Sequence, residues 1–211
     1  MTVPAVYPIL DTTSLFRLAI PPVVFAEAVL EGGARILQFR NKGPWTRDTL
    51  RLATWISDLC REAGASFILN DRADFAAIIH SGLHVGQDDL SPSDARRVIG
   101  PDAILGFSTH NPAQIKAAGS EPADYVAFGP IFQTTSKLRP DPTAGLGGLK
   151  AVRALTTKPL VAIGGITREN ANACWSAGAD SVAVIADMLP LSCTKQAIRD
   201  RMTEWQKLNP R

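Results

Sequence analysis

Short polar motifs follow apolar, strand-like runs at six places along this chain, and this pattern constrains its fold more than any other feature. The runs are rich in Val, Ile and Leu, which is typical of parallel strands buried on both faces. A helix-like segment comes after each motif. The six motifs are QFRNK (38–42), NDR (70–72), GQDD (86–89), GFSTH (106–110), GPIFQTTSK (129–137) and GGI (164–166). Because parallel strands present their carboxyl ends on one side, the motifs are expected to meet at one rim.

This alternation predicts an α/β fold, a (β/α)8 TIM barrel in which residues 1–211 form a single domain. A length of 211 residues lies at the compact end for that fold. A doubly wound open sheet is the alternative, but it normally carries a G-x-G-x-x-G turn after its first strand, where this chain reads PILDTTS. The eight expected strands are Val6–Leu10, Arg35–Phe39, Ser66–Asn70, Leu83–Val85, Ala103–Phe107, Tyr125–Phe128, Leu160–Ile163 and Ser181–Ile185.

Helix boundaries are indicated by capping residues. Helices are expected at Arg47–Ala63 and, closing the barrel, at Lys195–Leu208. Expected starts are Thr46, Ser91, Asn111 and Thr167 with Asn170. Expected ends are Gly32, Gly64, Gly82, Gly100 and Gly178. Residues 133–148, with two prolines and three glycines, are predicted to form a long active-site loop.

Composition restricts the partners and the compartment. A net charge of +2 without runs of like charge indicates neither a nucleic-acid-binding nor a membrane-binding surface. The three cysteines, Cys60, Cys174 and Cys193, are far apart, which favours reduced thiols in the cytosol over disulfides or a zinc site. The first residues lack the basic segment of a signal peptide, so a cytoplasmic protein is expected.

Two carboxylates follow neighbouring strands. Asp71 ends the third expected strand and Asp89 comes just after the fourth, so both are predicted to lie on one side of the rim. Such a pair suits Mg²⁺, which keeps several waters and bridges to substrate phosphate. The alternative is that each aspartate only caps a helix.

Cationic side chains follow the second strand. In an extended segment Gln38, Arg40 and Lys42 alternate onto one side, and Arg40 and Lys42 offer phosphate-binding groups. A solvated pair of surface charges is the alternative. Their position after the buried run ARIL favours a phosphate site.

Two further segments indicate phosphate binding. Thr134, Thr135 and Ser136 precede Lys137 at the start of the long loop, where hydroxyls, amides and a lysine can surround a phosphate. Gly164–Gly165 and the end of the eighth strand resemble the short loops that bind phosphate through backbone amides in barrels. For the glycines, a tight turn is the alternative.

The histidines do not form a metal pair or a triad with the residues around them. His84 is expected to be a packed, hydrogen-bonded residue in a strand. His110 is expected with Ser108 at the rim, where an imidazole can act as an acid or a base.

Taken together, these motifs resemble the thiamine phosphate synthase family over about Tyr7 to Met188. The motifs that carry the resemblance are Gln38-x-Arg40-x-Lys42, Asn70-Asp71-Arg72, His84-x-Gly86-Gln87-x-Asp89, Ser108-x-His110, Asp124-Tyr125 with Gly129-Pro130, Thr134 to Lys137 and Ile163 to Ile166. The resemblance implies a TIM barrel that joins a hydroxymethylpyrimidine diphosphate to a thiazole phosphate, giving thiamine monophosphate and diphosphate. The implied route is dissociative: diphosphate leaves first, and the thiazole nitrogen then attacks the pyrimidinylmethyl cation.

The resemblance also implies a role for each matching residue. Asp71 and Asp89 would hold Mg²⁺. The pyrimidine diphosphate would contact Gln38, Phe39, Arg40, Asn41, Lys42, Asn70, Ser108 and Lys137, of which Arg40, Lys42, Ser108 and Lys137 would act in catalysis. The thiazole phosphate would contact Thr134, Thr135, Ser136, Gly165, Ile185 and Ala186.

The chain departs from the family pattern in its lid and in two other places. Gln133 and Ser136 stand where the family usually has proline and threonine, and Ala186 replaces a common serine. The segment between Asp71 and His84 looks one residue shorter than usual. The alternatives are a thiazole tautomerase of the same superfamily and a non-catalytic thiazole-phosphate-binding barrel. The retained carboxylates favour the synthase, with small molecules as its substrates and an oligomeric state that the sequence leaves open.

Overall fold

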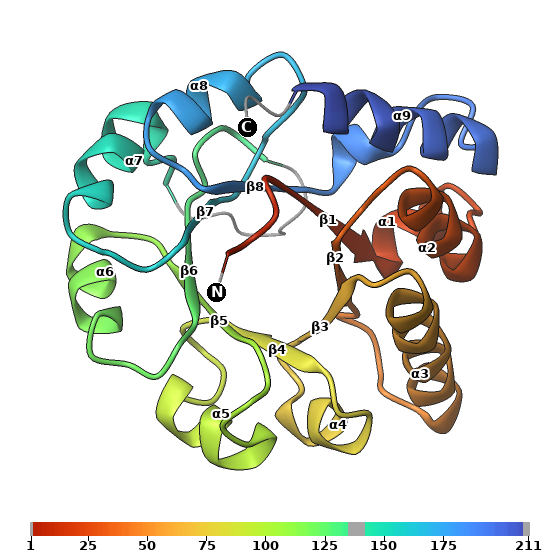
Figure 1. The fold of residues 1–211 in the computed structure, drawn as a ribbon, viewed down its shortest axis with the longest axis horizontal. Helices are drawn as coiled ribbons and strands as arrows, with labels where there is room; N and C mark the ends of the chain where they lie inside the picture. The colour runs from red at the N-terminus through yellow and green to blue at the C-terminus, as the bar shows by residue number, and fades with distance from the viewer. Residues whose placement is uncertain (1, 135–141, 209–211) are drawn as a thin grey trace.

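The computed structural model describes residues 2–134 and 142–208. Within them eight parallel strands form a closed barrel, in which each strand pairs with the next along the sequence and β8 pairs with β1. The helices surround the barrel on its outside (Figure 1). The prediction of a TIM barrel is therefore confirmed, and an open sheet is excluded by the β1–β8 pairing.

The strands lie close to where the apolar runs placed them. They are β1 (Val6–Asp11), β2 (Ile36–Arg40), β3 (Ser66–Asn70), β4 (Gly82–Val85), β5 (Leu105–Thr109), β6 (Tyr125–Phe128), β7 (Leu160–Ala162) and β8 (Ser181–Val184). Strands β3 and β6 have the predicted bounds, and most of the others differ at an end by one residue.

Strand β5 differs most from its prediction. It was expected at 103–107 and lies at Leu105–Thr109. Ala103 remains outside the strand, where its carbonyl accepts a hydrogen bond from Arg96, while Ser108 and Thr109 continue the pairing with β6. Ser108 is therefore fixed within a strand and does not belong to a loop.

Helices connect the strands. In the described residues they are α1 (Thr12–Arg17), α2 (Pro22–Glu31), α3 (Arg47–Glu62), α4 (Ala73–Ile78), α5 (Pro92–Ile99), α6 (Pro112–Ala118), α7 (Gly145–Arg153), α8 (Ala171–Ser176), the 3₁₀ helix η1 (Ala186–Met188) and α9 (Lys195–Leu208). Because α7 begins at Gly145, the long loop expected at 133–148 ends earlier than predicted.

Three predicted caps are confirmed. The side chains of Thr46, Ser91 and Asn111 accept hydrogen bonds from backbone N–H groups in the first turns of α3, α5 and α6, as N-caps do. Of the start predicted at Thr167 with Asn170, Asn170 is the N-cap of α8, although its side chain makes no capping hydrogen bond, whereas Thr167 lies before the helix. There the Asn170 side chain accepts the Thr167 N–H at 2.8 Å and holds the preceding loop.

Four of the five predicted helix ends are confirmed, at Gly32, Gly64, Gly100 and Gly178. The prediction for Gly82 is wrong, because it is the first residue of β4. Helix α4 ends earlier, and His80 adopts the left-handed conformation (φ 52°) that reverses the chain.

The apolar core has two layers. The larger lies between the strands and the helices, and the smaller fills the barrel interior. The inner layer consists of Val3, Tyr7, Ile36, Ile68, Tyr125, Ala127, Val161 and Ala183. Two of its members are tyrosines, so polar hydroxyls lie inside the barrel.

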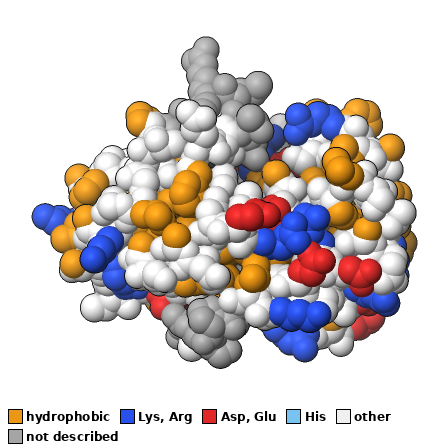
Figure 2. All heavy atoms as spheres, turned by 90° about the horizontal axis from the view of Figure 1, so that it is seen from above, with side chains coloured by type: hydrophobic (Ala, Val, Ile, Leu, Met, Phe, Trp, Pro, Cys, Tyr) orange, Lys and Arg blue, Asp and Glu red, His pale blue; other side chains and the backbone are white. Residues whose placement is uncertain are grey.

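Ion pairs join the outer helices. Lys195 at the start of α9 contacts Glu27 and Glu31 of α2, at 2.8 Å each. On the face drawn in Figure 2, basic and acidic side chains lie next to one another. No helix in residues 2–134 and 142–208 combines the length and apolarity that a membrane span requires.

The three cysteines are free thiols, as predicted. Cys60 and Cys174 are buried, and burial raises the pKa of the Cys60 thiol to about 12 and that of Cys174 to about 11. Both thiols therefore stay protonated and pack as apolar groups.

Candidate active site

The end of β2 divides its residues between two sides of the barrel wall. Gln38 is buried inside, where its amide donates to the Tyr7 hydroxyl at 3.2 Å. The Phe39 ring packs in the outer layer against Trp45 and Phe67. The Phe39 side chain therefore does not reach the interior with Gln38, and only its backbone remains available to a ligand.

Arg40 is held by a residue that sequence reasoning missed. Its guanidinium forms an ion pair with Asp11, which is 3% exposed at the end of β1. Asp11 also accepts the N–H and hydroxyl of Ser14, at 2.8 and 2.7 Å. Knowledge of the strand register would have identified Asp11, because Asp11 and Arg40 are direct partners across β1 and β2.

The next residue of this motif is held in the same way. The Asn41 side-chain oxygen accepts the Thr12 hydroxyl at 2.7 Å, and its amide nitrogen donates to the Gly43 carbonyl at 3.1 Å. The first residue of α1 thus helps to position the loop after β2.

Lys42, Asp71 and Asp89 form a cluster of charges at the rim. Lys42 Nζ lies 2.5 Å from Asp71 Oδ2, and the Asp71 side chain reaches Asp89. Burial and, less strongly, the charge and hydrogen bond of Asp71 raise the pKa of Asp89, although the Gly86 N–H that it accepts at 2.7 Å opposes this. Two adjoining carboxylates of this kind are stabilised by a cation.

The backbone at Asp71 is strained. Its φ is +67°, a left-handed value that few residues other than glycine adopt. Its N–H donates to the His84 carbonyl at 2.8 Å, which fixes it against β4. Strain of this kind occurs often at functional sites.

Asn70 ends β3 beside this cluster. It is 6% exposed, and its Nδ2 has no hydrogen-bond partner in the described structure. Because a buried amide without a partner is costly, this donor is suited to a ligand.

Ser108 lies on β5, which pairs with β4 next to the Asp89 loop. Its Oγ is 2.8 Å from His84 Nε2, and its carbonyl accepts the Gln87 amide at 2.6 Å. His84 is 7% exposed and hydrogen-bonded, as predicted. His110 is also held by hydrogen bonds. Its Nδ1 lies 2.6 Å from the Gly129 carbonyl oxygen, and its backbone N–H donates to the Gln114 side chain at 2.7 Å.

The loop after β7 packs closely against the loop after β6. Gly165 has φ +64°, and a Cβ there would lie 2.3 Å from the Gln133 carbonyl oxygen. A glycine is therefore required for both backbone and space. The Phe132 N–H donates to the Gly164 carbonyl at 3.1 Å, which brings this turn against Phe132 and Gln133, the residues just before Thr134.

Ile185 precedes η1, which begins at Ala186, so these two residues lie at the rim end of β8. Of the hydroxyl run, Thr134 is described, whereas Thr135, Ser136 and Lys137 lie outside the described residues. The structure thus gives positions for only part of the predicted phosphate-binding loop.

A network behind the β7 and β8 loops was also missed. Arg168 Nε donates to Asp187 at 3.0 Å, and Arg201 Nη1 donates to the Asp187 carbonyl at 2.6 Å. Asn170 donates to the Gly165 carbonyl at 3.1 Å. The sequence signal is weak, because α9 contributes from far along the chain.

Across residues 2–134 and 142–208, no group of three or more His, Cys, Asp or Glu residues could hold a metal ion. Zinc and most transition metals need such a set. The pair Asp71 and Asp89 fits Mg²⁺ better, because this ion is usually bound by one or two carboxylates together with substrate phosphate and water.

Comparison with known proteins connects this geometry to one family. The model of the family described as thiamine monophosphate synthase matches residues 6–188. A thiamine-phosphate synthase of Koribacter versatilis (strain Ellin345) is 54% identical over 166 residues, 78% of each chain. One of Chlorobium phaeovibrioides (strain DSM 265 / 1930) is 48% identical over 168 residues, 79% of this chain and 80% of the relative.

A solved structure gives the same result. The thiamine phosphate pyrophosphorylase of Pyrococcus furiosus superposes with a TM-score of 0.83 at 30% identity, covering 97% of this chain and 94% of that one. Family model, sequence relatives and fold agree over nearly the same residues. The chain belongs to the thiamine monophosphate synthase family.

Proposed function

We propose that this chain is a thiamine phosphate synthase, a transferase that acts on two small molecules. It joins 4-amino-2-methyl-5-(diphosphooxymethyl)pyrimidine to a thiazole phosphate and releases diphosphate. Family membership supports the reaction. The observation that carries the site assignment is the cluster of Lys42, Asp71 and Asp89 beside the unpartnered amide of Asn70.

The site residues divide into three groups by chemistry. The first group acts on the diphosphate. In it, Asp71 and Asp89 would hold Mg²⁺, which would supply positive charge to the diphosphate as it leaves. Arg40, Lys42 and Lys137 add fixed positive charge there, and Asn70 donates a hydrogen bond. Asp11 keeps the Arg40 guanidinium oriented.

The second group surrounds the thiazole phosphate. Thr134, Thr135 and Ser136 provide hydroxyls, and Gly165, Ile185 and Ala186 provide backbone amides. Close packing of the Gly165 turn against the β6 loop supports this assignment, because it brings Thr134 near the β7 turn.

The third group, Gln38 and Ser108, holds the pyrimidine. The C–O bond to diphosphate breaks first, and diphosphate leaves with the electron pair. The thiazole nitrogen lone pair then forms the new C–N bond to the pyrimidinylmethyl cation. This route requires no general base, so no histidine has to accept a proton.

The test is a paired assay on purified protein with both substrates and Mg²⁺, which measures thiamine phosphate formation and thiazole tautomer conversion. Wild type is expected to form thiamine phosphate, and His110→Asn to lose less than about tenfold, whereas removal of a general acid or base typically costs about 10² to 10⁴ fold. Isomerisation alone, lost in His110→Asn, would identify a tautomerase. Binding of the thiazole phosphate without diphosphate release would identify a non-catalytic barrel.

A further inference from the structure

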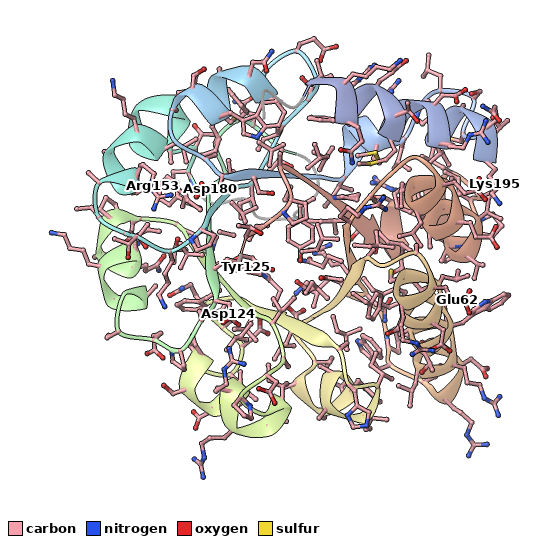
Figure 3. All side chains as sticks on the ribbon, viewed as in Figure 1. Glu62, Asp124, Tyr125, Arg153, Asp180 and Lys195 are labelled. Atoms are coloured by element: carbon pink, nitrogen blue, oxygen red, sulfur yellow. The ribbon has the colours of Figure 1, made fainter. Side chains whose placement is uncertain are left out.

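A continuous chain of hydrogen bonds crosses the barrel interior between two proposed pyrimidine-binding residues. Gln38 Nε2 donates to Tyr7 OH at 3.2 Å, and Tyr7 OH lies 3.0 Å from Tyr125 OH. Tyr125 OH lies 2.9 Å from His84 Nδ1, and His84 Nε2 lies 2.8 Å from Ser108 Oγ. Figure 3 shows Tyr125 pointing from β6 into the interior. The three middle residues have no role in the reaction described above.

Strand β5, which lies between His84 on β4 and Tyr125 on β6, leaves space for this chain of hydrogen bonds. Gly106 on β5 pairs with His84 on β4 and with Tyr125 on β6. A Cβ at Gly106 would lie 2.1 Å from Tyr125 Cζ, 2.3 Å from its hydroxyl and 2.5 Å from His84 Nδ1. Any other residue at 106 would therefore displace the Tyr125–His84 contact. The Tyr125 and His84 rings also stack, with centroids 5.6 Å apart.

The proton count limits how the chain can be arranged. Burial raises the pKa of both Tyr7 and Tyr125, so each phenol stays neutral and supplies one proton. A neutral imidazole donates from one ring nitrogen and accepts at the other. If both phenol protons are used inside the chain, all four bonds run in the same direction.

A single direction makes the two ends complementary. Because Gln38 donates its amide N–H to Tyr7, its Oε1 remains an acceptor for a ligand. At the other end, His84 Nε2–H donates to Ser108, so the Ser108 proton remains a donor. The opposite direction would require the Gln38 amide to be turned over, so that Oε1 accepts from Tyr7, and would exchange the roles of the two ends.

We propose that Tyr7, Tyr125 and His84 are positioning residues that make Gln38 present an acceptor and Ser108 a donor to the aminopyrimidine. The proposal rests on the proposed function. An aminopyrimidine carries an N–H donor on its amino group and an acceptor on its ring nitrogen, which are the complementary groups. A 4-oxo analogue, with a carbonyl acceptor and a ring N–H donor, reverses both and is disfavoured by a site whose protons are fixed.

The variants that test this are Tyr7→Phe and Tyr125→Phe, which remove one hydroxyl each and keep the ring in the core. With the amino substrate, kcat/KM is expected to fall about tenfold, which corresponds to about 1.4 kcal/mol. The preference for the amino over the 4-oxo pyrimidine diphosphate is expected to shrink by a similar factor. The KM for thiazole phosphate should stay within about twofold, because that substrate is not proposed to contact the residues of the hydrogen-bond chain.

Thr109→Val is the matched control. Thr109 is fully buried on β5 beside Ser108, and its hydroxyl donates to the Ala127 carbonyl at 2.8 Å without joining the chain. Its loss tests the effect of removing any buried hydroxyl near the site. The ratio of amino to oxo activity should remain at the wild-type value in this variant, even if its melting temperature falls.

A second measurement does not depend on turnover. Nitrogen-15 NMR of the histidine rings, with the His84 signals identified by their absence in His84→Gln, is expected to show a single tautomer protonated at Nε2. Tyr125→Phe is expected to remove that preference. An Nδ1–H tautomer in wild type would overturn the assigned direction, and an unchanged amino-to-oxo ratio in both phenylalanine variants would overturn the positioning role. A wild type that forms no thiamine phosphate would refute the proposed function. The His84 tautomer would then still test the direction of the hydrogen-bond chain.

Discussion

Asp89 is an acidic group in a position that disfavours its charge. Burial and the neighbouring Asp71 raise its pKa above the ordinary value of an aspartate. In the metal-free protein the folded state therefore binds the Asp89 proton more tightly than the unfolded state does. The ionised carboxylate destabilises the fold at neutral pH, and this cost is relieved as the pH falls through the raised pKa. A residue retained despite such a cost is expected to serve ligand binding.

Replacing Asp89 should separate stability from activity. In EDTA at neutral pH, Asp89→Asn is expected to melt at a higher temperature than wild type, and the difference should shrink as the pH is lowered. With Mg²⁺ and both substrates, its kcat should fall by about 10² to 10³ fold, the usual effect of losing a group that stabilises developing charge. A scan of melting temperature against pH and a turnover assay measure the two effects. Asp71→Ala is the companion variant, expected to be inactive with native circular dichroism. Full turnover by the wild type in EDTA would contradict the metal assignment.

Lys137 should act on the transition state more than on binding. Although it lies outside the described residues, its proposed role is to stabilise the departing diphosphate. Lys137→Ala is expected to lower kcat by about 10² to 10³ fold and to leave the KM for thiazole phosphate nearly unchanged. Steady-state kinetics with each substrate varied separately would test this. A raised KM with unchanged kcat would instead indicate that the lysine binds substrate and transition state equally.

At the scale of elements, two strand starts are held by the same arrangement. In each, an aspartate just before a strand accepts the backbone N–H that begins a neighbouring strand and pairs with an arginine from a helix. The two sets are Arg96, Asp124 and Leu105, and Arg153, Asp180 and Leu160. Figure 3 shows Arg153 and Asp180 next to each other. Both sets lie at the amino ends of the strands, where barrels carry residues for stability.

The arginines also bind loop carbonyls. Arg153 contacts Asp180 at 2.8 Å and donates to the Lys158 carbonyl at 2.9 Å. Arg153→Met should therefore lower the free energy of unfolding by about 1–3 kcal/mol and leave kcat unchanged. Urea unfolding would measure this. The control is Arg51→Met. Arg51 is 71% exposed and pairs along α3 with Asp48, which is also exposed, so its loss should cost less than about 0.5 kcal/mol. Equal losses in the two variants would rule out a special role for the Arg153 arrangement.

At the scale of the whole molecule, the closed barrel brings Lys42, Asp71 and Asp89 together at one rim, where a cation and an anionic ligand can bind. Mg²⁺ together with diphosphate should raise the melting temperature, because a ligand at 100 times its Kd adds about 2.7 kcal/mol to folded-state stability. Differential scanning calorimetry of wild type should show this shift. Asp71→Ala should show little of it, and an equal shift in that variant would place the metal elsewhere.

Sequence pattern was sufficient for the order of the elements. Runs such as SFIL and YVAF are buried on both faces, so their length and composition determine where β3 and β6 begin and end. Caps such as Thr46 and Ser91 act through local hydrogen bonds and were equally readable. The errors, at Thr167, Gly82 and the start of β5, arose where a side-chain hydrogen bond to the backbone or a left-handed residue determined the boundary.

By itself, the sequence determined that polar groups follow the strands and that Asp71 and Asp89 share one rim, because these follow from chain order and the parallel arrangement. Tertiary structure decided which side chains meet. The pairing of Asp11 with Arg40 depends on the register of β1 against β2. The contact of Tyr125 with His84 depends on space left by Gly106 between them. Register and space arise only when the barrel closes, because both require strands that are distant in sequence to be packed together.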